Sequence, residues 1–190
     1  MKKNSKRWII VIVIALSIGI KGIDGVREIT DDRVSSTSKI GGNEDRIDKI
    51  PKLKKIPVKL IRKVDGDTAV FSMENPRDGE LKVRYLLIDT PETVKPNAKI
   101  QPFGKEASNR NEQILKNANQ IYLMLDKGAR TDRYGRVLAY VFADDILVQE
   151  KLVSEGLAEV KYIKPPSTKY LSKLKRAQNK AEKKCIGIWK

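Results

Sequence analysis

Histidine is absent from this chain, and cysteine occurs only once among its 190 residues. Without histidine, no imidazole is available to act as a general base, to bind a metal or to activate a serine or cysteine nucleophile. The single Cys185 excludes an intramolecular disulfide and a cysteine zinc site. Any chemistry must therefore come from carboxylates, arginines, lysines and hydroxyls, or from a hard metal ion bound through oxygen.

Negative charge is scarce relative to positive charge. The chain has 39 lysines and arginines against 24 aspartates and glutamates, a formal net charge of +15. A field of this sign favours an anionic partner, such as nucleic acid or an anionic membrane surface. A lysine-rich surface that only keeps the protein soluble is the alternative that charge alone leaves open.

The N-terminus has the composition of an export segment. Four basic residues precede an uncharged apolar run from Trp8 to Ile20, which is the order found in secretory signals. The run is shorter than the roughly 20 residues of an ordinary membrane span. We therefore expect residues 1–22 to be a signal peptide or a signal-anchor, and the protein to be secreted or tethered to the outer face of the cytoplasmic membrane.

The rest of the chain divides into a polar stretch and a patterned one. Residues 23–53 are mixed in charge and rich in turn formers, which predicts a flexible linker. Residues 54–190 are expected to form the domain. Apolar periodicity predicts strands over 56–64, 67–73, 81–88, 120–126 and 136–143, and helices over 102–119, 149–158 and 167–184. This order is typical of a small Greek-key barrel with helices packed outside it.

Aspartates at the ends of predicted strands are candidates for a metal site. Asp65 and Asp67 flank a glycine in "VDGDT", and side chains two apart on an extended segment point the same way. Taken alone, this pair is explained better by a polar turn between two strands. Asp89 ends the third predicted strand, where it is able to meet Asp67 at one rim of the barrel. Carboxylates with a main-chain carbonyl, for which Thr90 before Pro91 is the candidate, make a calcium-type site.

Arginines and a tyrosine supply candidate phosphate contacts. Arg84 lies inside a hydrophobic strand, where it needs either an aspartate partner or a phosphate. The segment 127–136, "KGARTDRYGR", contains Arg133 and Arg136 around Tyr134. Basic residues with an interleaved aromatic suit phosphate clamping with stacking, although an exposed basic hairpin loop is an equally good interpretation of this segment alone.

Taken together, "DGDT", "RYLLIDTPE" and "RTDRYGR" resemble, in this order and spacing, the thermonuclease family, whose founding member is staphylococcal nuclease. The resemblance extends over residues 54–190. It implies an α+β fold, a five-stranded OB-fold Greek-key β-barrel with about three helices packed outside. It also implies a calcium-dependent endonuclease that hydrolyses DNA and RNA and leaves 3′-phosphate ends. We expect a monomer.

The resemblance also assigns roles to individual residues. Asp67, Asp89 and the Thr90 carbonyl match the calcium ligands of the family, with Asp65 beside them. Arg84 and Arg136 match its two catalytic arginines. Glu92 matches the glutamate that activates or orients the attacking water. The remaining matches are substrate contacts: Tyr134, Tyr162 and, where the founding member has lysine, Arg133.

One departure from the family pattern concerns base stacking. Lys164 stands where a second tyrosine often follows Tyr162, and a lysine offers charge in place of an aromatic face. Two other classes of protein remain as alternatives. A non-catalytic OB-fold module that binds nucleic acid is one, and an adaptor that binds anionic membrane surfaces is the other.

Overall fold

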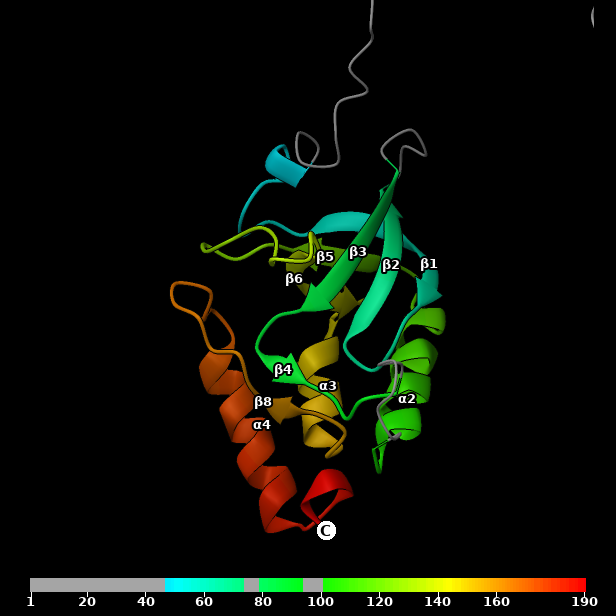
Figure 1. Cartoon of the computed structure of the whole chain (residues 1–190), viewed down its shortest axis with the longest axis vertical. Helices are drawn as coiled ribbons and strands as arrows, with labels where there is room; N and C mark the ends of the chain where they lie inside the picture. Colours follow the sequence, from blue (N-terminus) through cyan, green and yellow to red (C-terminus); the bar gives the residue numbers. More distant parts are fainter. Residues whose placement is uncertain (1–46, 74–78, 94–100) are drawn as a thin grey trace, which may run out of the picture. The chain divides into compact units, whose positions relative to one another are not determined.

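The computed structural model describes residues 47–73, 79–93 and 101–190, and these form a barrel with helices packed against it (Figure 1). The predicted export segment and most of the predicted linker lie outside the described residues. The barrel strands are β1 (Ile56–Lys63), β2 (Thr68–Met73), β3 (Glu80–Tyr85), β5 (Ile121–Met124) and β6 (Val137–Ala143). The five-stranded fold expected from the sequence is thereby confirmed.

The register of the strands shows how the barrel closes. Neighbouring strands pair antiparallel in the order β3-β2-β1-β5-β6, and β3 then pairs with β6 in parallel. Because β3 has partners on both sides, the sheet has no free edge along the paired part of that strand. A two-residue strand, β7 (Ile146–Leu147), extends β6 as a hairpin.

The helices that cover the barrel are α2 (Gly104–Lys116), α3 (Val148–Ser154) and α4 (Leu171–Lys183). Helix α3 contacts β6 as well as both other helices, so it links them to the barrel (Figure 1). The buried side chains of α4 are Leu174, Ala177 and Ala181, which lie on one face at helical spacing. A final 3₁₀ turn, η2 (Gly187–Trp189), packs against the end of α4.

The third strand is shorter than the sequence predicts. It ends at Tyr85, because Leu87 has a positive φ of 66° and turns the chain. Asp89 therefore belongs to a separate strand, β4 (Ile88–Asp89), which pairs with β8 (Glu159–Val160). Arg84 Nη1 stabilises this turn by donating to the carbonyl oxygens of Tyr85 and Ile88, at 3.1 and 2.8 Å. A local hydrogen-bond requirement thus overrides the apolar pattern of "YLLI".

Residues 47–53 pack on the barrel, although the sequence places them in the linker. The side chains of Ile47 and Ile50 are buried in the core. Arg130 Nη1 donates to the carbonyl oxygens of the same two residues, at 2.9 and 2.6 Å. Arg130 therefore holds this segment in place, and it does so from within the basic loop that the sequence suggested for phosphate binding.

Candidate functional site

One cleft of about 900 Å³ contains every predicted site residue. It lies at the ends of β2, β3 and β4 and is bounded by the 128–136 loop and the chain that follows β8. The predicted site residues that line it are Asp65, Asp67, Arg84, Asp89, Thr90, Glu92, Arg133, Tyr134, Arg136 and Tyr162. Lys164 lines the same cleft, so the departure from the family pattern is at the site itself.

Asp67 is the most buried acid of the cleft, and its carboxylate is held by several donors. Its Oδ2 accepts hydrogen bonds from the N–H and the hydroxyl of Thr90, at 2.9 and 3.2 Å. The glycine of "DGDT" allows this approach, because a Cβ on Gly66 would lie 2.6 Å from the Thr90 hydroxyl oxygen. Burial raises the pKa of Asp67 to about 7; Arg84 and the Thr90 N–H oppose this shift, whereas Asp65 and Asp89 add to it.

Arg84 bridges the two candidate metal ligands. Its Nη1 lies 3.1 Å from Asp67 Oδ2, and its Nη2 lies 2.8 Å from Asp89 Oδ1. The ion pair that the sequence left open as one alternative is therefore present, with an arginine side chain that is only 10% exposed. The ring of Tyr162 lies over the same guanidinium, with 5.5 Å between the ring centroid and Cζ.

The arrangement of Asp67 and Asp89 fits a hard divalent cation. Both acids are paired with Arg84, and Asp65 is close enough to raise the pKa of Asp67, so negative charge converges here. Oxygen donors of this kind suit calcium or magnesium. Within the described part of the chain, no three histidine, cysteine, aspartate or glutamate side chains form a ready cluster for a metal ion. A cation would thus need main-chain carbonyls and water beside the two carboxylates.

Glu92 enters the cleft from the loop after β4. Its N–H donates to Gln101 Oε1 at 2.9 Å, and the N–H of Gln101 donates to the Glu92 carbonyl oxygen at 3.1 Å. These two bonds join the chain on either side of residues 94–100. The position of Glu92 is therefore determined by a contact between segments nine residues apart.

Arg136 lines the cleft just before β6 and is oriented by Asp132. The Nε of Arg136 donates to Asp132 Oδ2 at 2.7 Å, and Asp132 also accepts the N–H groups of Tyr134 and Arg136. Burial opposes ionisation of Asp132, but these hydrogen bonds outweigh it and hold its pKa below the usual value. Asp132 was not among the predicted site residues; its place four residues before Arg136 is the signal that would have found it.

Both predicted tyrosines present their rings to solvent. Tyr134 is 67% exposed and Tyr162 is 57% exposed, far more than the core tyrosines of the barrel. The guanidinium of Arg133 lies over the Tyr134 ring, with 4.7 Å from Cζ to the centroid. Exposed aromatic faces beside cations are suited to stacking on a base or sugar.

Asn111 is a supporting residue that the sequence did not reveal. It is fully buried on α2, where its Nδ2 donates to the Asp65 carbonyl oxygen at 3.0 Å. Its Oδ1 accepts the hydroxyl of Tyr85 at 3.0 Å. Asn111 thereby fixes the "DGDT" loop to helix α2 and to strand β3. An asparagine within a predicted helix gives no sequence signal for such a role.

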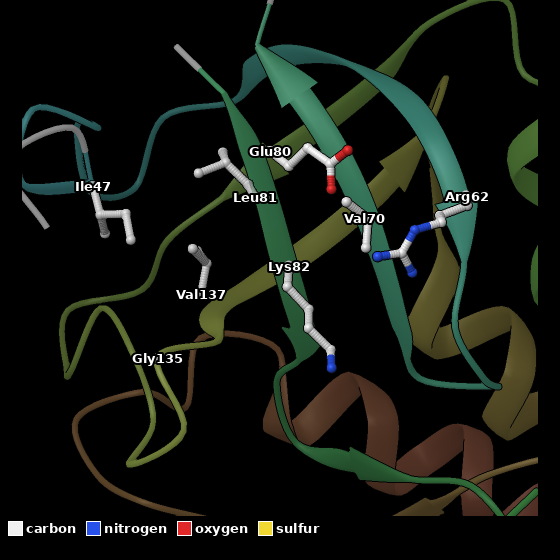
Figure 2. Close-up of a pocket in the computed structure, with 8 residues that line it drawn as sticks. All are labelled: Ile47, Arg62, Val70, Glu80, Leu81, Lys82, Gly135 and Val137. Atoms are coloured by element: carbon white, nitrogen blue, oxygen red, sulfur yellow. The ribbon is translucent and has the colours of Figure 1, made fainter. Parts of the chain in front are cut away.

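A smaller hollow of about 240 Å³ lies on the outer side of β1, β2 and β3 (Figure 2). The strand register places Arg62, Val70 and Lys82 in one row, and Figure 2 shows the two cationic side chains in the same hollow. Lys82 lines the cleft as well, two residues from Arg84 on the same face of β3. Positive charge thus continues from the cleft onto the barrel surface.

Comparison with known proteins gives the family of this chain. The family model described as "Staphylococcal nuclease homologue" matches residues 82–190. The thermonuclease of Staphylococcus intermedius is 42% identical over 128 residues, which cover 67% of this chain and 73% of that protein. The chain belongs to the staphylococcal nuclease family. The family membership inferred from the three motifs is confirmed.

Two further relatives of this chain, both longer than the chain itself, come from Bacillus subtilis (strain 168). The SPbeta prophage-derived endonuclease YokF is 47% identical over 134 residues, and Endonuclease YncB is 45% identical over 136 residues. These matches cover 70% and 72% of this chain, but only 44% and 63% of the two relatives. The chain therefore spans about half to two thirds of the length of these relatives.

Proposed function

We propose that this chain is a calcium-dependent endonuclease that hydrolyses phosphodiester bonds of DNA and RNA and leaves 3′-phosphate ends. The observation that carries the proposal is the cleft itself, which combines two arginines, a glutamate and a pair of aspartates. The similarity to two endonucleases and to a thermonuclease supports the nuclease activity. The oxygen-only donor set of Asp67 and Asp89 supports a hard divalent cation such as calcium.

Arg84 and Arg136 line the cleft from two neighbouring, parallel strands, β3 and the start of β6. Two guanidinium groups so placed are able to bind a phosphodiester and stabilise charge that develops on its oxygens. A calcium ion held by Asp67, Asp89 and the Thr90 carbonyl would add further stabilisation of that charge. Tyr134, Tyr162 and Arg133 would hold the neighbouring sugar or base.

Glu92 is the residue of the cleft that is suited to the attacking water. A carboxylate within hydrogen-bond reach orients the water or accepts its proton, and no histidine is required. The new bond forms between the water oxygen and phosphorus, and the bond from phosphorus to the 5′ oxygen breaks. That oxygen takes up a proton, and the phosphate remains on the 3′ oxygen.

Calcium dependence is tested by removing the metal from the full-length chain. Cleavage of single-stranded DNA should be rapid with millimolar calcium and should fall to background with excess chelator. Magnesium should support little activity, because it prefers a tighter octahedral site and holds its water molecules. End-group analysis of the fragments should give 3′-phosphate and 5′-hydroxyl ends.

Three other outcomes would contradict parts of this proposal. Full activity in excess chelator would exclude the metal-dependent mechanism. Fragments with 5′-phosphate ends would reverse the bond that is cleaved. Tight oligonucleotide binding without any cleavage would favour the non-catalytic nucleic-acid-binding module that the sequence left open.

We also propose that the enzyme acts outside the cytoplasm. The support is the basic segment followed by the apolar run from Trp8 to Ile20, which lies outside the described residues. No helix within the ranges that the structure describes is long and apolar enough to cross a membrane.

Export is tested by locating the nuclease activity. The activity of the full-length protein should be found outside the cells, and after deletion of residues 1–20 it should be found inside them. Active full-length protein found only in the cytosol would contradict export.

A further inference from the structure

Lys161 occupies one face of the Asp89 carboxylate. Its Nζ donates to Asp89 Oδ2 at 3.0 Å and to Glu159 Oε1 at 2.7 Å. The backbone of Lys161 is fixed as well, because its N–H donates to the Leu87 carbonyl oxygen at 2.9 Å. The lysine therefore continues the pairing of β8 with β4 and is held beside the acid that it contacts.

The pairing of β4 with β8 explains why a lysine is favoured here. It places Asp89 directly opposite Glu159, and like charges in that position repel. The ammonium group between them neutralises the repulsion. As a consequence, one of the two aspartates that are suited to the divalent cation already carries a tethered cation of its own.

The two oxygens of Asp89 thus have different cationic partners. Oδ1 accepts a hydrogen bond from Arg84 Nη2 at 2.8 Å, and Oδ2 accepts a hydrogen bond from the Lys161 ammonium group. A metal ion that binds Asp89 through Oδ2 must displace the lysine or share the oxygen with it. In either case the positive charges of the metal and the ammonium group repel each other at short range.

We propose that Lys161 competes with the divalent cation at Asp89 and sets the calcium concentration at which the site fills. This inference depends on the calcium site of the proposed function. Lys161 is not required to touch the substrate. A unit charge next to a divalent ion in a partly exposed site should weaken binding about tenfold.

The test measures calcium binding without substrate, by isothermal titration calorimetry on the full-length chain. Lys161→Gln removes the charge and keeps a hydrogen-bond donor between the two acids, so folding should be retained. Its dissociation constant for calcium should be about tenfold lower than that of the parent chain. Lys161→Arg keeps the charge and should bind calcium like the parent chain.

Lys173 provides a matched control. Its Nζ lies 2.7 Å from Glu150 Oε2, and its side chain is 47% exposed, against 46% for Lys161. Lys173→Gln removes the same charge outside the cleft and should leave the calcium affinity unchanged. The rise in melting temperature on adding calcium should be larger for Lys161→Gln than for either the parent chain or Lys173→Gln.

The outcomes separate this inference from the function on which it depends. Equal calcium affinities for the parent chain and Lys161→Gln would overturn the inference and leave the calcium site in place; Lys161 would then only neutralise Asp89 and Glu159. If Lys161→Gln and Lys173→Gln both bound calcium more tightly than the parent chain, the cause would be a general charge effect. That result would also overturn the inference. Absence of calcium binding in every form would overturn the calcium site itself.

Discussion

Replacing Arg136 by alanine should lower turnover about a hundredfold or more, while the chain remains folded. Asp132 holds the Nε side of this guanidinium and orients it at the edge of the cleft. The Nη groups are then placed to meet a phosphoryl oxygen, and removing such a donor costs about 10²- to 10³-fold in rate. Single-turnover cleavage of a short DNA oligonucleotide with saturating calcium would measure the effect.

Arg110 gives the control for the loss of an arginine–carboxylate pair. Its Nε lies 2.7 Å from Glu155 Oε2, which equals the distance between Arg136 Nε and Asp132 Oδ2. The two arginines are similarly exposed, at 29% and 26%. Arg110→Ala should change the melting temperature as much as Arg136→Ala or more, but should not lower turnover. Equal turnover for both variants would contradict a catalytic role for Arg136.

Companion variants extend this test to the rest of the predicted catalytic set. Glu92→Gln should lower turnover by a similar factor, because the amide is a poor acceptor for the proton of water.

The role of Arg84 is tested with Arg84→Lys and not with alanine. Alanine would leave two acids without their buried partner and would lower the free energy of unfolding by about 3–5 kcal/mol. Lysine keeps the charge and loses the planar fork. Near-normal turnover of Arg84→Lys would assign Arg84 to the structural ion pair alone.

The second large effect concerns stability. Gly156→Ala should lower the free energy of unfolding by about 3 kcal/mol or more, because it combines backbone strain with a steric clash. Gly156 has a φ of 67°, and an added Cβ would lie 2.3 Å from the Ile186 carbonyl oxygen. The Gly156 carbonyl also accepts the N–H of Ile188 at 2.8 Å, so the clash would push the final turn away from helix α3.

Gly135 separates the strain from the clash. Its φ of 72° is nearly the same, but nothing lies within 4 Å of an added Cβ. Gly135→Ala should therefore cost only the strain, about 1–2 kcal/mol. Urea unfolding of both variants, followed by circular dichroism, would measure the difference. Equal losses of stability would show that the C-terminal turn yields to the methyl group without cost.

The sequence determined the local character of most elements and the chemical types in the site. Alternating apolar residues are sufficient to identify the barrel strands, because one face of each must be buried. The lack of histidine by itself restricts the chemistry to carboxylates, basic side chains and hydroxyls. Motif order identified the family, since "DGDT", "RYLLIDTPE" and "RTDRYGR" each combine a turn requirement with charged side chains at fixed spacing.

Tertiary structure decided which of these side chains meet and what holds them. The pairing of β2 with β3 and the turn at Leu87 bring Asp67 and Asp89 onto one guanidinium, because Asp67 lies just before β2 and Asp89 lies in β4. The pairing of β4 with β8 depends on hydrogen bonds between segments far apart in the chain. The same pairing places Lys161 on Asp89. Such contacts leave no periodic pattern in the sequence, since they depend on where the turns bring the chain.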